Sequence, residues 1–422
     1  MGQGEPVRQG GVSAVSLGLF GSLYALQGVV IAYFFNYNQL YMMAGGVAAP
    51  RAAEVQSLAL LPFILKFLAG PLSDRVNLLG WGHRKPYIIL GLLVQSAGLL
   101  SLSRIHPAAQ LSLFTITAVA TVAGLALYDT CCDGLVIDVT PAGDRERVQG
   151  VLVACRAVAA MVCSLGFGLL LERTGNGPGA GDLVLWICAA LGAIPLGLAL
   201  LAAEPCPAAG AADGFQWRAL GALLRPRSLV LLAFGAAYSV VGYGVEINLS
   251  PFYGQDLQFR DATIGGLASA RYVGRAAGAA ILASAAPRIG RHRVIQLGLL
   301  ALAATTAAQA SIRGPGSAGL AGLAFGAANG WMDALFFVLA MEASDPRMAA
   351  STYALFMAVT NISVTGGALV AWLENALSGF GSGYRMAFVV TGCLAVLAWP
   401  LIRFLSRPQE IRGPETQPSS LP

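Results

Sequence analysis

The chain alternates between long apolar stretches and short segments that hold most of its charges, and this pattern limits what it can fold into. Its 422 residues are 56% hydrophobic and only 11% charged, whereas soluble domains carry about 25% charged residues. So few charges cannot cover a soluble fold of this size, which excludes a soluble enzyme, a disordered chain and a nucleic-acid-binding protein. We therefore expect a membrane protein, and we interpret the net charge of +5 as a bias between the two sides of a membrane.

Twelve stretches are long and apolar enough to cross a bilayer as helices, each of which needs about 20 such residues. They are apolar on all sides, which favours helices over the alternating strands of a membrane β-barrel. The 52 glycines suit helices that pack closely in lipid. We predict an all-α polytopic membrane protein with spans at residues 12–35, 55–73, 86–103, 111–139, 148–171, 183–203, 229–251, 262–285, 294–312, 316–341, 349–373 and 386–405.

The basic residues predict how these spans are oriented. If the N-terminus is cytoplasmic, 16 Lys and Arg residues fall in inside segments and 6 in outside loops. Because cytoplasmic loops are enriched in these residues, we predict cytoplasmic N- and C-termini and an even number of spans. No cleaved signal peptide is expected, because the first apolar run is too long for a signal core. The expected location is the inner (plasma) membrane of a bacterium.

The longest inside loop divides the chain into two halves of six spans. We predict a first six-helix bundle at 1–203, a cytoplasmic linker at 204–228, a second bundle at 229–405 and a cytoplasmic tail at 406–422. A weak repeat at an offset of 200 supports this division, since Asp-Gly-Leu at 133–135 matches Asp-Ala-Leu at 333–335 and Asp129 matches Asn329. Parallel six-span repeats are one architecture of secondary transporters.

A basic loop with a recognisable motif follows span two. It reads GPLSDRVNLLGWGHRKPY from 70 to 87, and it resembles the loop between spans two and three of the major facilitator superfamily. A degenerate echo without an acidic residue, PRIGRHR, follows span eight at 287–293. The resemblance implies twelve helices in two bundles and a gating role for Gly70, Asp74, Arg75, Gly82, Arg84 and Lys85. The alternative is a basic inside loop that only obeys the charge rule.

Shorter motifs resemble particular branches of that superfamily. LPFILK at 61–66, followed by HRKPY at 83–87, is similar to the folate–biopterin transporters. YDTCCDG at 128–134, together with Arg156 in span five, is similar to the muropeptide permeases and the acetyl-CoA transporters. The light-harvesting-assembly branch has a similar long loop. These motifs are short, and no substrate follows from them.

Charged residues inside spans are the main functional signal, because a charge at the bilayer centre costs at least about 2.5–3.5 kcal/mol. Asp129 and Asp133 lie four residues apart and share a helix face, which suits proton coupling or substrate binding. Arg156 is expected to bind an anion or to pair with one of these two carboxylates. The candidate substrate and coupling residues are Lys66, Asp129, Asp133, Arg156, Glu246, Arg271, Arg275, Asn329, Trp331 and Asp333.

Each of the other candidates also has a structural alternative. Arg271 and Arg275 form a basic face on span eight, and their expected partners are Glu246 and Asp333. Trp331 either stacks on a substrate or only packs. For the polar and aromatic residues at the outer end of span one, an interfacial belt is the favoured interpretation; they are Tyr33, Phe34, Phe35, Asn36, Tyr37, Asn38 and Tyr41.

The preferred functional hypothesis is a secondary active transporter that moves a small anionic or zwitterionic organic solute by alternating access, coupled to protons or another ion. No enzyme signature, nucleotide-binding loop or metal-ligand spacing is present in the sequence, so we expect no enzyme activity, cofactor, metal or nucleic-acid partner. The protein is expected to act as a monomer in the bilayer. The alternative is a non-transporting assembly factor for pigments or photosynthetic complexes on the same fold. A receptor or sensor is a weaker third hypothesis.

Overall fold

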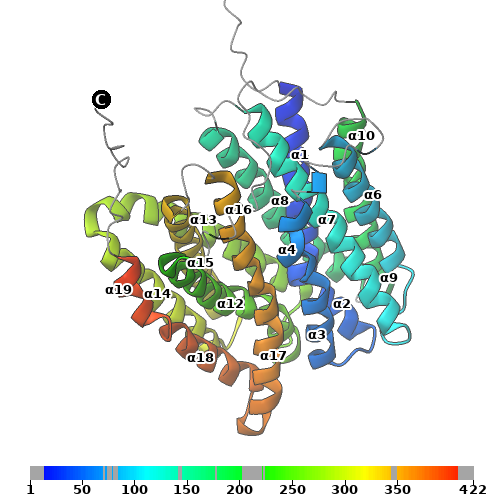
Figure 1. Cartoon of the computed structure of the whole chain (residues 1–422). Helices are drawn as coiled ribbons and strands as arrows, with labels where there is room; N and C mark the ends of the chain where they lie inside the picture. The colour runs from blue at the N-terminus through cyan, green and yellow to red at the C-terminus, as the bar shows by residue number, and fades with distance from the viewer. Residues whose placement is uncertain are drawn as a thin grey trace, which may run out of the picture.

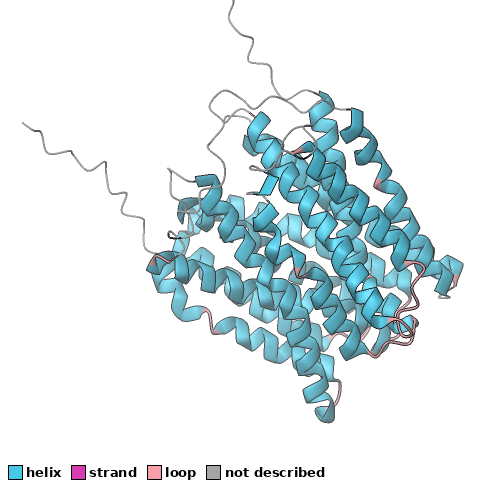
Figure 2. Cartoon of the chain, turned by 45° about the vertical axis from the view of Figure 1, so that its right-hand side comes forward, coloured by secondary structure: helices cyan, strands magenta, loops and turns pink. Residues whose placement is uncertain are grey.

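The computed structural model describes residues 14–69, 72–73, 78, 84–140, 145–175, 178–201, 221, 224–343 and 349–406. Within these residues all regular structure is helical (Figure 2). The first part of the chain forms α1 (Ala14–Asn36), α2 (Asn38–Ala44), α3 (Ala49–Leu60), α4 (Pro62–Leu65), η1 (Lys66–Leu68), α6 (Lys85–Leu102), α7 (Leu111–Val139), α8 (Arg145–Thr174), α9 (Pro178–Leu191) and α10 (Ala193–Leu201).

The second part of the chain lies beside the first, on the left of Figure 1. Its main helices are α12 (Pro226–Gln255), α13 (Asp261–Ile289), α14 (Arg291–Ala308), α15 (Pro315–Ala343), α16 (Ala349–Thr360), α17 (Gly366–Leu377), α18 (Gly383–Val396) and α19 (Ile402–Leu405). A 3-10 turn, η6 (Asn361–Thr365), joins α16 to α17. Helices α3 and α17, which are far apart in sequence, pack side by side between the two parts (Figure 1).

Ten helical segments in the described part are long and apolar enough to cross a membrane. The two expected spans that are missing from this set are 55–73 and 262–285. The first is divided among α3, α4 and η1 at Pro62, because proline has no backbone N–H and disrupts a continuing helix. The second is the 29-residue helix α13, which carries Arg271 and Arg275 among other charges that lower its mean hydropathy. The total of twelve spans therefore stays a prediction.

The buried apolar side chains form two clusters, one for each part of the chain. One contains residues between Leu19 and Ala199, together with Ile247 and Val364 of the second part. The other contains residues between Leu231 and Leu405. Most of the predicted linker at 204–228 and of the tail at 406–422 lies outside the described residues, so the four domain boundaries stay predictions.

Two glycine contacts let helix backbones approach closely at the centre of the protein. A Cβ atom on Gly28 of α1 would collide with the backbone carbonyl of Arg156 in α8, and one on Gly326 of α15 would collide with the carbonyl of Arg271 in α13. Small residues are favoured where membrane helices pack in this way. The close packing fixes the backbone from which both arginine side chains project.

The two halves meet at what we call the far end, where α8 and α12 end and α13 begins. There Arg260 forms an ion pair with Glu172 at 3.0 Å, and deeper in the interface the Ser269 hydroxyl donates to the Met161 carbonyl at 2.6 Å. Nearer the middle, the Asn361 amide donates to the Phe63 carbonyl at 2.9 Å. These contacts join helices of the two halves directly.

The expected interfacial belt at the end of span one is wrong. Asn36, Asn38, Tyr33 and Tyr37 are all buried, at no more than 3% exposure. The Asn38 amide donates to Gln56 at 2.5 Å, and the Tyr33 hydroxyl donates to Asn38 at 3.1 Å. Polar side chains buried in a membrane protein need such partners, because an unpaired polar group in hydrocarbon is costly. This segment is part of the interior, where it contacts the second half.

Candidate functional site

The first half holds a cluster of charged and polar side chains on α1, η1 and α7. Lys66, at the point where α4 passes into η1, forms an ion pair with Asp129 of α7 at 3.1 Å. One turn further along α7, Asp133 accepts a hydrogen bond from the hydroxyl of Tyr24 on α1. No cation lies within ion-pair distance of Asp133 in the described part of the chain. The two carboxylates therefore share a helix face, as expected, but have different partners.

Arg156 projects from α8 and is partly exposed. Among the described residues its guanidinium makes no hydrogen bond or ion pair, so the alternative in which it pairs with Asp129 or Asp133 does not hold. It is close enough to interact electrostatically with Lys66 and Asp133 of its own half and with Tyr243 of the other half. This places an unpaired guanidinium between the two halves.

The second half holds a more tightly paired cluster on α12, α13 and α15. Arg275 binds Glu246 at 2.8 Å and contacts Asp333 through its Nε at 3.5 Å. Its guanidinium carbon lies 4.9 Å from the centre of the Tyr243 ring, and the Tyr243 hydroxyl donates to Asp333 at 3.3 Å. The predicted pairing of a span-eight arginine with Glu246 and Asp333 is confirmed for Arg275.

The same arrangement of residue types occurs in both halves. In the first, a base on the second span (Lys66) and a tyrosine on the first span (Tyr24) contact carboxylates of α7. In the second, Arg275 of α13 and Tyr243 of α12 contact the carboxylate of Asp333 on α15. Tyr24 is not among the residues predicted from the sequence, where it is a lone tyrosine in an apolar run.

Arg271 differs from Arg275, although it lies one turn away on the same helix. It is 2% exposed, and its Nη2 donates to the Asn36 side-chain oxygen of the first half at 2.7 Å. Its Nε and Nη1 are buried without a partner. The expected pairing of Arg271 with Glu246 or Asp333 is wrong. Asn36 is also not among the predicted site residues, because its place in an aromatic run is typical of a membrane interface.

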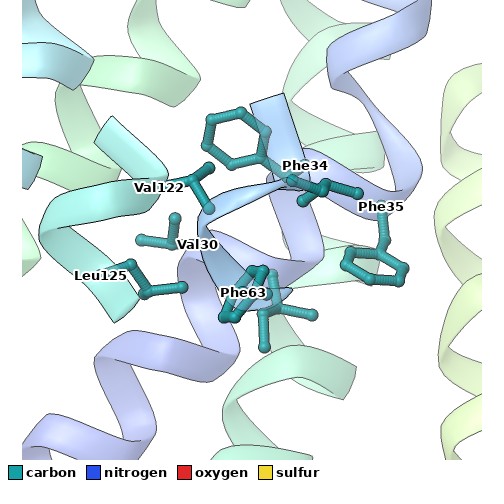
Figure 3. A pocket seen from close by; sticks show the side chains of 8 residues that line it. Val30, Phe34, Phe35, Phe63, Val122 and Leu125 are labelled. Atoms are coloured by element: carbon teal, nitrogen blue, oxygen red, sulfur yellow. The ribbon is translucent and has the colours of Figure 1, made fainter. Parts of the chain in front are cut away.

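A small apolar pocket lies in the first half (Figure 3). It has no enclosed room for a water molecule, whereas most ligand pockets measure roughly 300–1,000 Å³. Phe35, in its wall, packs edge-to-face on Tyr243 of the second half with ring centres 6.3 Å apart. The full lining is Val30, Ile31, Phe34, Phe35, Leu60, Phe63, Val122 and Leu125.

Two of the predicted site residues on α15 are not part of either charged cluster. The Trp331 indole N–H donates to the Val294 carbonyl of α14 at 3.1 Å, so the ring is held against a neighbouring helix. Asn329 is fully buried, and its amide donates to the Phe325 carbonyl of its own helix at 2.9 Å. Both side chains bind backbone carbonyls of helices, which is typical of residues that pack rather than bind a solute.

Part of the predicted gating loop can be described. Arg84 donates to the Ser73 hydroxyl at 2.7 Å, and Lys85 donates to the Leu200 carbonyl of α10 at 3.2 Å; both partners belong to the first half. Gly70, Asp74, Arg75 and Gly82 lie outside the described residues, so the gating role stays a prediction.

The echo loop of the second half obtains its acidic partner from another helix. Arg291, at the start of α14, forms an ion pair with Glu342 near the end of α15 at 2.5 Å. The echo motif has no acidic residue of its own, and Glu342 of α15 is the acidic partner of its Arg291. Only the tertiary structure could bring these two residues together.

Comparison with known proteins agrees with this architecture. The family model described as Major Facilitator Superfamily matches residues 15–368. The structure is similar to a bacterial homologue of the human lysosomal transporter Spinster in an inward-facing, unoccupied conformation, with 17% identity, a TM-score of 0.72, and coverage of 93% of this chain and 96% of that one. It is also similar to the nucleoside transporter NupG, with 13% identity, a TM-score of 0.74, and coverage of 94% and 100%. A comparison with curated proteins gives no match.

Proposed function

Since this chain belongs to the major facilitator superfamily, we propose that it is a secondary transporter that moves a small organic anion or zwitterion across a membrane by alternating access. The observation that carries the proposal is that two charged residues near the centre of the first half lack an ion-pair partner in the part of the chain that the structure describes, whereas their neighbours are paired. Lys66, Asp129, Arg275 and Glu246 are all paired, whereas Arg156 and Asp133 lack an oppositely charged partner among the described residues. An intramembrane charge without a partner is costly, which favours a ligand that supplies one.

The two groups have complementary chemistry for such a ligand. A guanidinium binds a carboxylate or phosphate through two parallel hydrogen bonds. A carboxylate held by a tyrosine hydroxyl can accept an ammonium group or a proton, and intramembrane carboxylates form proton relays in transporters. We propose that Arg156 binds the anionic group of the solute and that Asp133 is the proton-coupling residue. The pairs Lys66–Asp129 and Arg275–Glu246 then hold both groups in place.

The proposed topology has twelve spans, with α3, α4 and η1 together forming the second and α13 forming the eighth. In such a fold, alternating access is largely the rocking of one six-helix half against the other. The excess of basic residues predicts that the termini are cytoplasmic. The far end would then face away from the cytoplasm, and the contacts there would close it.

A ligand screen on the purified protein tests the anion-binding role. The melting temperature of the wild type and of Arg156→Gln is measured with a panel of amino acids, organic acids, phosphate esters and neutral sugars. We expect stabilisation by one class of carboxylate or phosphate in the wild type and none by that class in the variant. Stabilisation that is equal in both proteins would refute the role of Arg156.

Uptake into proteoliposomes tests the coupling. The stabilising solute is supplied with and without an inward proton gradient, to the wild type and to Asp133→Asn. We expect the gradient to drive accumulation in the wild type only. If the wild type accumulates the solute equally with and without the gradient, proton coupling is refuted. Binding of the solute without any uptake would favour an assembly factor on the same fold.

A further inference from the structure

The interface between the two halves contains a group of buried hydrogen-bond donors that make no hydrogen bond of good geometry within the described residues. They are the Nε and Nη1 of Arg271 and the hydroxyl of Tyr253, all buried and without a partner. Tyr253 of α12 is fully buried and lies within reach of the Arg271 guanidinium, for which its hydroxyl oxygen can act as an acceptor while the hydroxyl hydrogen has no partner. Leaving one buried donor unsatisfied costs about 1–3 kcal/mol, and more for a charged group.

The charge at this position is also uncompensated. No carboxylate lies within ion-pair distance of Arg271 among the described residues, since Glu246 binds Arg275 one turn away. Arg271 donates to the side-chain oxygen of Asn36 at 2.7 Å and lies beside the Tyr253 hydroxyl, and both of these groups are neutral. A buried charge is normally paired, because its desolvation costs several kcal/mol.

Asn36 is held so that its oxygen points at the guanidinium. Its amide nitrogen donates to the Ala32 carbonyl at 3.0 Å and to the Ser164 hydroxyl at 3.3 Å. The side chain can therefore offer Arg271 one hydrogen bond but no negative charge. The first half thus contributes a fixed dipole, and the second half contributes the unpaired guanidinium and the tyrosine hydroxyl.

From this geometry we infer that Arg271 and Tyr253 form a binding site for a small inorganic anion such as chloride, enclosed between the halves. A water molecule could accept from the same donors, but it would leave the charge of the guanidinium uncompensated, whereas an anion supplies both the acceptor and the charge. We infer a small anion because Arg271, Tyr253 and Asn36 are each no more than 3% exposed, so that a large one would have to separate the halves. This goes beyond the proposed function and does not depend on the identity of the solute.

The site lies on the far-end side of the solute-binding residues. Arg271 precedes Arg275 by four residues, which places it about 6 Å closer to the start of α13 at 1.5 Å per residue. Because the Asn36–Arg271 hydrogen bond crosses between the halves, an anion bound there stabilises the arrangement in which they are in contact. Bound chloride would therefore favour the state with the far end closed, by binding that state alone.

The test is the thermal stability of the purified full-length protein while chloride replaces gluconate at constant ionic strength. We expect the melting temperature of the wild type to rise with chloride and to saturate. Tyr253→Phe removes one donor and keeps the ring, so the half-saturating chloride concentration should increase about tenfold or more, as for loss of a hydrogen bond to a charged group. Tyr128→Phe is the matched control, because that hydroxyl is also buried without a partner but lies on α7.

A second variant replaces the anion with a side chain. Asn36→Asp puts a carboxylate at the oxygen that now accepts from Arg271, so the chloride response should disappear, although its second oxygen loses the hydrogen bond that the amide donates to the Ala32 carbonyl. A wild-type melting temperature that is indifferent to chloride overturns the inference. An unchanged half-saturation in Tyr253→Phe, or an equal change in Tyr128→Phe, also overturns it.

Discussion

The two arginines that face the centre from opposite halves should respond differently to the same substitution. Arg275 binds Glu246 at 2.8 Å and contacts Asp333 at 3.5 Å, whereas Arg156 makes no ion pair in the described part. Replacing each by glutamine removes the charge and keeps much of the side-chain volume. We expect Arg275→Gln to destabilise the protein and Arg156→Gln to impair solute binding with little effect on stability.

The expected magnitudes follow from what each substitution leaves behind. Arg275→Gln leaves Glu246, which is 3% exposed, without a cation, and breaking such a pair costs about 3–5 kcal/mol. For a chain of this length, 1 kcal/mol corresponds to roughly 1 °C in melting temperature, so we expect a loss of about 3–5 °C. Arg156→Gln leaves no partner unpaired, and its effect should stay within about 0.5 kcal/mol.

For solute affinity, we expect Arg156→Gln to have the larger effect of the two substitutions. Loss of hydrogen bonds between a guanidinium and an anionic group costs about 1.5–3 kcal/mol, so Arg156→Gln should weaken binding of the stabilising solute by about 10- to 100-fold. Melting curves and solute titrations on both variants measure the two quantities. The double variant Arg275→Gln/Glu246→Gln should recover part of the lost stability. If Arg156→Gln lowers the melting temperature as much as Arg275→Gln, then Arg156 has a structural partner and the reasoning is wrong.

Three further predictions follow from individual contacts. Asp133→Asn keeps an oxygen that accepts from Tyr24 but cannot take up a proton, so uptake should become independent of the proton gradient while the melting temperature changes by less than about 1 °C. Gly326→Ala should lower the melting temperature by several degrees, because its Cβ would meet the Arg271 carbonyl; Gly316→Ala on the same helix has open space around it and should have no such effect. Trp331→Phe loses a hydrogen bond to a backbone carbonyl, so it should reduce stability by about 0.5–1.5 kcal/mol without changing solute affinity, and a selective loss of affinity would restore Trp331 to the solute site.

Much of the architecture follows from the order of apolar and charged residues. A helix in lipid satisfies its own backbone hydrogen bonds, so each long apolar run specifies its secondary structure without help from the rest of the chain. The exceptions are two segments in which a proline or several charged residues interrupt the apolar run. Pro62 divides one expected span, and the charges of α13 lower the mean hydropathy of another.

The candidate site was predictable as a set of residues but not as a set of contacts. Any charge inside an apolar run is exceptional enough to be noticed, which is why Lys66, Asp129 and Arg275 were identified. Neutral partners such as Tyr24 and Asn36 give no comparable signal, because tyrosine and asparagine are common at membrane interfaces. Their roles appear only when α1 is packed against α7 and α13.

The sequence by itself determined that this chain is an all-helical membrane protein with charges concentrated inside a few spans, because the cost of placing charge in lipid is a local property of each residue. Only the tertiary structure decided which of those charges are paired. Arg271 and Arg275 are equivalent in the sequence, four residues apart on one helix, yet one binds Glu246 and the other faces Asn36 of the opposite half. That difference depends on how two halves of the chain pack, and helix periodicity within one segment carries no information about it.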